Sequence, residues 1–211
     1  MSIEATHDGN LAPAVRGPAL VHPLWVRLTH WINAAAVVVM VGSGWEIYNA
    51  SPLFAFVFPQ PLTLGHWLAG GLLLHFAAMW VLAVNGLVYL VLGVATGRFR
   101  RKLLPIRASQ LLADARAAMT RTLSYDDLSV YNALQRLLYL GVILASIVAV
   151  LSGLAIWKPV QLQQLTAVFG GYDTARYVHF FAMASIVAFA LVHVTMALIV
   201  PRTLRAIITG R

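Results

Sequence analysis

The chain has 211 residues, of which 60% are hydrophobic and 10% are charged, and its formal net charge is +8 at pH 7. A soluble domain carries about a quarter charged residues, so this composition excludes a soluble enzyme and predicts a protein that lies mostly in lipid. The chain contains no cysteine. Disulfides, thiolate iron–sulfur clusters and covalent CxxCH haem attachment are therefore excluded.

Long stretches without Asp, Glu, Lys or Arg predict the membrane-spanning segments. Four of them can each hold a span of roughly 20 residues, and prolines interrupt residues 49–64 too often for a fifth. We expect an all-α membrane protein, a four-helix transmembrane bundle, with helices near 24–47, 67–96, 131–156 and 177–200. A polar tail over 1–21 precedes this four-helix domain of residues 22–211, which includes a long loop over 97–130.

The distribution of positive charge predicts the orientation. Of the 15 lysines and arginines, only Lys158 and Arg176 fall at the end of the bundle opposite the 97–130 loop. The positive-inside rule then places both termini and this loop in the cytoplasm. The basic charge is thus a topology signal in contact with lipid, and a nucleic-acid partner is not expected. Apolar residues at helical spacing over 111–119 predict a helix on the membrane surface.

Four histidines lie inside the predicted spans: His30, His75, His179 and His193. An ionisable side chain in lipid is costly, so a functional role is the default. His75 and His179 each lie 22 residues before the cytoplasmic end of their helix, while His30 and His193 lie 7 and 8 residues from that face. Two pairs of imidazoles at two depths are what two stacked b-type haems need for axial ligation by histidine on both sides.

An internal repeat supports His75 as the ligand from the second helix. Residues 75–79 (HFAAM) echo residues 179–183 (HFFAM), and Ser43-Gly44 echoes Ser152-Gly153. His66 is the rival on the second helix. It lies 31 residues before the cytoplasmic end of that helix, which predicts a position at the periplasmic surface, and whether it replaces His75 stays open.

Arginines near the histidines are candidates for binding the haem propionates. Arg27 lies three residues before His30, Arg176 lies three residues before His179, and Arg136 is a further candidate. Ordinary interfacial anchoring of these long side chains is an equally good interpretation.

Five segments carry a resemblance to a known family: HPLWVRLTHWINA (22–34), HFAAMWVLAVNGLVYL (75–90), TGRFRRKLLP (96–105), LSGLAIWKP (151–159) and VHFFAMASIVAFALVHV (178–194). The chain resembles the bacterial di-haem cytochrome b561-like family, which contains the cytochrome b membrane subunits of thiosulfate reductase, formate dehydrogenase and nickel–iron hydrogenase. The thiosulfate reductase type is the most similar. In this family the first and second helices each give one haem ligand and the fourth gives two, which corresponds to His30, His75, His179 and His193.

The resemblance implies an electron-transfer subunit of the bacterial inner (cytoplasmic) membrane with two non-covalent haem b groups, rather than a stand-alone catalyst. Such a subunit passes electrons between quinone and a periplasmic redox subunit, here expected to be molybdopterin-dependent. It also implies a quinone site near the cytoplasmic haem, to which Arg27, Tyr89, Arg136 and Tyr139 could contribute. Glu46 and Asn85 are polar enough to be alternatives, or they are structural residues. Two other functions stay open: a histidine-based transporter of divalent metal, and a quinone oxidoreductase that acts alone.

Overall fold

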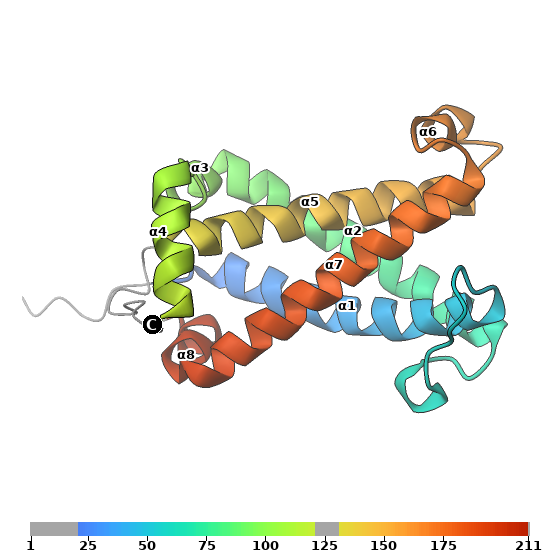
Figure 1. The fold of residues 1–211 in the computed structure, drawn as a ribbon, viewed down its shortest axis with the longest axis horizontal. Helices are drawn as coiled ribbons and strands as arrows, with labels where there is room; N and C mark the ends of the chain where they lie inside the picture. The colour runs from blue at the N-terminus through green and yellow to red at the C-terminus, as the bar shows by residue number, and fades with distance from the viewer. Residues whose placement is uncertain (1–20, 121–130, 211) are drawn as a thin grey trace, which may run out of the picture.

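The computed structural model describes residues 21–120 and 131–210 of the chain. Four of its helices are long and apolar enough to cross a membrane: α1 (Leu24–Ala50), α2 (Leu68–Ala95), α5 (Ala133–Trp157) and α7 (Tyr172–Ile199). The described residues contain no strand. The predicted all-α, four-helix membrane bundle is therefore confirmed (Figure 1).

The helix ends follow local sequence signals. α5 begins with a capping box, in which the Gln135 backbone N–H donates to Asn132 Oδ1 over 2.8 Å and the Asn132 backbone N–H donates to Gln135 Oε1 over 3.1 Å. α7 begins directly after Gly170 and Gly171, whose φ angles are 82° and 103°. It starts five residues before the predicted 177, because its first turn carries polar residues that lie outside the apolar stretch.

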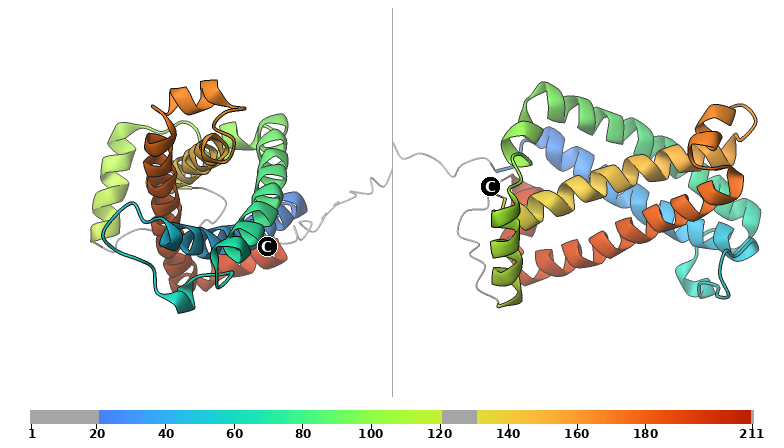
Figure 2. Two further views of the ribbon diagram at one scale, coloured as in Figure 1. Left: turned by 90° about the vertical axis from the view of Figure 1, so that its right-hand side faces the viewer. Right: turned by 45° about the horizontal axis from the view of Figure 1, so that its top comes forward.

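The four long helices form two antiparallel hairpins. α1 packs along α2, and α5 packs along α7, while the helices of different hairpins approach each other much less closely. The end-on view in Figure 2 shows the four helices arranged around the long axis of the molecule. The repeat in the sequence thus corresponds to two hairpins of similar design.

The two ends of the bundle differ. One end carries only the 51–67 loop with η1 (Gln60–Leu62) and the connection that contains α6 (Gln163–Val168). The other end carries α3 (Arg98–Lys102), α4 (Ala108–Met119) and α8 (Pro201–Thr209), and α4 lies across the bundle axis as a surface helix would (Figure 1). The predicted tail up to residue 20 and the loop residues 121–130 lie outside the described residues.

Small residues form the tightly packed part of the protein. Ser43 and Ser152 are the largest side chains with less than 2% exposure among the described residues. Close packing on small residues is how membrane helices associate without a hydrophobic driving force. Within the first hairpin, the Asn85 side chain also donates to the Thr29 carbonyl oxygen and to Asn33 Oδ1, each over 2.8 Å, so Asn85 has the structural role that the sequence left open.

Candidate haem-binding site

His75 and His179 face each other from different hairpins. His75 belongs to α2 and His179 to α7, and their ring centroids lie 6.3 Å apart with 70° between the ring planes. We call them the distal pair, because they lie in the half of the bundle away from the ends of the described chain. Distal and proximal here refer to the two halves of the bundle and not to the two sides of one haem. The sequence repeat had matched these two residues, and the fold brings them together.

His30 and His193 form a second facing pair, the proximal pair. His30 belongs to α1 and His193 to α7, and their ring centroids lie 6.0 Å apart with 65° between the planes. α7 therefore contributes one histidine to each pair, at positions 14 residues apart. All four histidines that the depth argument selected lie in the two pairs.

The spacing within each pair fits one metal ion between the two rings. A metal ion binds an imidazole nitrogen at about 2.0 Å and the ring centroid lies about 1.1 Å behind that nitrogen, so two rings on opposite sides of one ion have centroids about 6.3 Å apart. The observed 6.3 and 6.0 Å match this value. All four rings are only partly buried by protein. The residues present thus fit a haem iron at each level.

The distal histidines have a defined tautomer. His179 Nδ1 lies 2.9 Å from the Ala149 carbonyl oxygen, and His75 Nδ1 lies 3.1 Å from Ser43 Oγ, whose proton is donated to the Val39 carbonyl oxygen. A carbonyl oxygen, and a serine oxygen that has already donated its proton, can only accept hydrogen bonds, so Nδ1 carries the proton in both rings and donates it. The Nε2 lone pair of each ring is left free, which is the form that binds a metal.

Aromatic rings surround the proximal histidines. Phe189 stacks on His193 with a centroid distance of 5.4 Å and 12° between the planes, and Tyr139 lies edge-on to His193 at 6.3 Å. Tyr139 in turn contacts Tyr131 at 5.1 Å. Two phenol groups therefore lie near one face of this pair, where the sequence had placed Tyr139.

The three candidate arginines hold backbone carbonyl oxygens in this structure. Arg27 donates to Ile208 of α8, and Arg176 donates to the Ser51 carbonyl oxygen over 2.6 Å. Arg136 donates to the carbonyl oxygens of Tyr131 and Pro105 over 2.9 and 3.0 Å. All three tie a helix to a neighbouring segment, and their part in binding propionates stays a prediction.

His66 lies apart from both pairs. It is exposed in the turn before α2, with a φ angle of 62°. The helix that carries His75 begins only at Leu68. The position of His66 outside this helix agrees with the surface location predicted from its distance to the cytoplasmic end.

His22 has surroundings that the sequence did not suggest. Arg98, 76 positions further along the chain, donates from Nη2 to His22 Nδ1 over 3.1 Å. Burial, and then the positive charge of Arg98, lower the pKa of His22 to about 4. Arg98 also hydrogen-bonds to Tyr131, whose pKa is raised by burial. No local motif links residues so far apart, so only the fold reveals this cluster at the proximal end.

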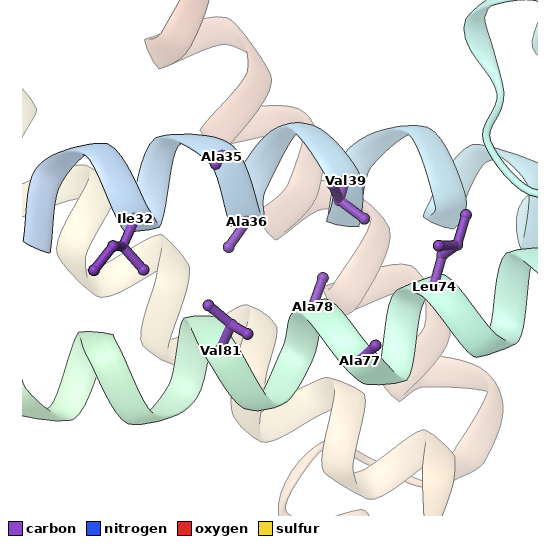
Figure 3. Close-up of a pocket in the computed structure, with 8 residues that line it drawn as sticks. All are labelled: Ile32, Ala35, Ala36, Val39, Leu74, Ala77, Ala78 and Val81. Carbon is purple, nitrogen blue, oxygen red and sulfur yellow. The ribbon is translucent and has the colours of Figure 1, made fainter.

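A groove between α1 and α2 carries none of these groups. It has a volume of about 400 Å³ and is lined by Ile32, Ala35, Ala36, Val39, Leu74, Ala77, Ala78 and Val81 (Figure 3). All of these side chains are apolar, so the groove offers no ligand to a metal and no partner to a polar head group. The candidate metal ligands are therefore the paired histidines, which lie outside this groove.

A lipid-spanning bundle with histidines paired between its hairpins defines a class, the membrane-bound cytochromes b. The model of the family described as prokaryotic cytochrome b561 matches residues 21–210, and the chain belongs to this family. It is 53% identical over 190 residues to a protein of Azospira oryzae named "Putative protein-methionine-sulfoxide reductase subunit YedZ1", an alignment that covers 90% of this chain and 96% of the relative.

Family membership confirms the resemblance found in the sequence. The chain is a multi-pass membrane protein, which in bacteria means the inner membrane, and it is a haem b subunit that serves membrane electron transfer.

Proposed function

We propose that this protein carries two haem b groups and passes electrons between quinone and an oxidoreductase subunit on the periplasmic side. The observation that carries the proposal is a pair of facing histidines at each of two levels. The ring centroids lie 6.0 Å apart in the proximal pair and 6.3 Å apart in the distal pair. His30 and His193 would hold the proximal haem, and His75 and His179 the distal haem. Bound haem would supply reversible one-electron chemistry at these two levels.

The spacing along α7 supports a route across the membrane. His179 and His193 are 14 residues apart, which is roughly 21 Å along a helix at 1.5 Å per residue. The two pairs thus occupy opposite halves of a hydrocarbon layer about 30 Å thick. Because His179 and His193 both belong to α7, a single helix sets the distance between the two sites.

The distal end is proposed as the periplasmic end, since the lysines and arginines concentrate at the other end. Its 51–67 loop packs against α7 through aromatic rings: Phe54 lies 5.2 Å and Tyr48 of α1 lies 5.4 Å from Phe180, the neighbour of His179. Phe54 and Phe56 remain 38% and 45% exposed. An ordered apolar surface beside one histidine pair is a suitable place for a redox partner to bind.

The name of the Azospira relative supports the kind of partner. That protein is described as a subunit of a protein-methionine-sulfoxide reductase. We propose that the present chain likewise serves an oxidoreductase subunit that repairs or reduces an oxidised substrate, and that this subunit is molybdopterin-dependent. A partner of this kind distinguishes the proposal from a quinone oxidoreductase that acts alone.

Quinone is proposed to bind at the proximal end. Tyr139 beside His193 and the neighbouring Tyr131 provide hydroxyl groups within reach of that pair. Tyr89 packs against Trp25 at 6.0 Å and Phe99 at 5.4 Å at the same end of the bundle. Phenol groups can donate a hydrogen bond to a quinone carbonyl oxygen.

The transporter alternative has less support. A divalent cation site would combine imidazoles with carboxylates at one depth. Among the described residues, no group of three or more His, Asp or Glu side chains comes together. Glu46 is buried at the α1–α2 contact beside Gly71 and belongs to neither pair.

The decisive experiment is a reduced-minus-oxidised spectrum of the purified protein, with haem and protein quantified together. About two low-spin haems b per chain are expected, one for each pair. Purified protein that is colourless, or that carries a single haem, would contradict the proposal. Co-purification of a second subunit from the native host, followed by its analysis for molybdenum, tests the partner.

A further inference from the structure

Each histidine of the distal pair contacts a serine of its own hairpin. Ser43 Oγ of α1 lies 3.1 Å from His75 Nδ1, and Ser152 Oγ of α5 lies 3.2 Å from His179 Nδ1. Both serines have no exposed surface. The two hairpins therefore repeat one arrangement, a buried hydroxyl against the outer nitrogen of an imidazole.

The direction of these hydrogen bonds follows from the other partners. The Ser152 hydroxyl donates to the Val148 carbonyl oxygen over 2.6 Å, and the Ser43 hydroxyl donates to the Val39 carbonyl oxygen over 2.5 Å. Since a hydroxyl has one proton, each serine oxygen can only accept from the histidine. The His75 Nδ1–H group thus donates to the Ser43 oxygen, and the His179 Nδ1–H group is shared between the Ser152 oxygen and the Ala149 carbonyl oxygen.

Acceptors at Nδ1–H change the imidazole as a ligand. They withdraw the proton toward oxygen and so increase the electron density at Nε2, which makes the ring a more basic ligand. A more basic axial ligand stabilises the ferric over the ferrous state, and hydrogen bonding around the ligands is one of the means by which a protein sets a haem potential. The serines would act on both axial ligands of one iron.

The proximal pair lacks this arrangement. Within residues 21–120 and 131–210, no hydrogen bond reaches the ring nitrogens of His30 or His193. The ring of His30 lies against Trp31 and His193, and that of His193 against Phe189 and Tyr139. The buried serine against Nδ1 is therefore found, in the described part of the chain, only at the distal level.

We propose that Ser43 and Ser152 are positioning residues that together lower the reduction potential of the distal haem. The inference rests on the proposed function, in that it takes His75 and His179 as the two ligands of one iron. It goes further by assigning to two buried hydroxyl groups a share in the difference between the two haems.

The test is a potentiometric titration of the haem absorbance in the purified holoprotein. Ser43→Ala and Ser152→Ala are expected to raise the potential of the same one of two components, and the double variant to raise it further, with the other component unchanged. Ser146→Ala is the matched control. Ser146 lies on the same helix as Ser152 and donates to the carbonyl oxygen of Val142, four residues before it, over 2.8 Å. Among the described residues it makes no hydrogen bond with a histidine. It should shift neither component.

Several results would overturn the inference. Unchanged or lowered potentials, or shifts in different components for the two serine variants, would contradict a joint action on one iron. If the serine variants lose the distal haem while Ser146→Ala keeps it, the serines secure haem binding instead of tuning it. A wild-type protein with two haems but unresponsive serine variants refutes this inference alone, whereas wild-type protein without two components refutes the proposed function.

Discussion

The ring centroids of His30 and His193 lie 6.0 Å apart, and the two ring planes make an angle of 65°. The corresponding angle for His75 and His179 is 70°. All four rings come from long, regular helices, α1 and α2 on one side and α7 on the other. The two levels of the bundle therefore share a similar arrangement of the two imidazole rings, although their surroundings differ.

This geometry predicts the electron paramagnetic resonance spectrum of the oxidised protein. Steeply crossed axial imidazoles leave two iron d orbitals nearly equal in energy, which gives a strongly anisotropic low-spin signal. We expect signals of this type from both haems. A rhombic signal with moderate anisotropy, typical of parallel imidazole planes, would show that the rings rotate on binding haem and that the angles described here do not persist.

A second prediction concerns the identity of the distal ligand. His75→Ala should reduce the haem content from about two to about one per chain, because the proposed ligation of the distal haem by two histidines would lose one imidazole. His66→Ala should keep both haems, since His66 is exposed in the turn before α2. Pyridine haemochrome assays on the two variants, normalised to protein, make the measurement. Loss of a haem in the His66 variant only would assign the distal site to His66.

Gly153 provides a third prediction. A Cβ atom at this position would lie 3.1 Å from His179 Cε1, closer than ordinary van der Waals contact. Gly153→Ala should therefore displace the imidazole and lower the occupancy of the distal haem, visible as a smaller absorbance change for one component in a redox titration. Gly141, on the same helix, has no atom within 4 Å of such a Cβ. Gly141→Ala should keep both haems and stabilise the helix by up to about 1 kcal/mol. Equal haem contents in both variants would argue against a tight fit at Gly153.

The sequence predicted the fold and the histidine pairing because both depend on distances along the membrane normal. An uncharged stretch fixes where a helix crosses, and counting residues from its end fixes the depth of His75 or His193. The known thickness of the bilayer thus relates residue number to depth, which is not possible for the sequence of a soluble protein. The start of α7 was predicted too late, since Asp173 and Arg176 interrupt the apolar stretch although the helix already runs through them.

Contacts that depend on helix rotation or on distant loops could not be predicted. The Ser43-Gly44 and Ser152-Gly153 repeats were visible, but only the packing within each hairpin turns the serine hydroxyls toward histidine nitrogens. The contact between His22 and Arg98 joins residues 76 positions apart across the end of the bundle. Neither composition nor periodicity determines such a contact.

His22 leads to the last prediction, which concerns pH. Burial and the charge of Arg98 lower the pKa of His22 from 6.5 to about 4 in the folded protein. Between these two values the unfolded chain binds a proton that the folded chain does not bind, so the free energy of unfolding rises with pH. The contribution of His22 is fully present above about pH 6.5 and is lost as the pH falls toward about 4.

Thermal unfolding of the detergent-solubilised holoprotein checks this prediction. The wild-type midpoint should fall between about pH 7 and about pH 5, because protonated His22 can no longer accept from Arg98 and meets its positive charge. In His22→Gln the side-chain oxygen can accept from Arg98 and does not titrate, so the midpoint should depend less on pH, while the two proteins should be similar above pH 7. Equal pH dependence in both proteins would contradict the prediction, because it would mean that protonation of His22 does not contribute to the change in stability.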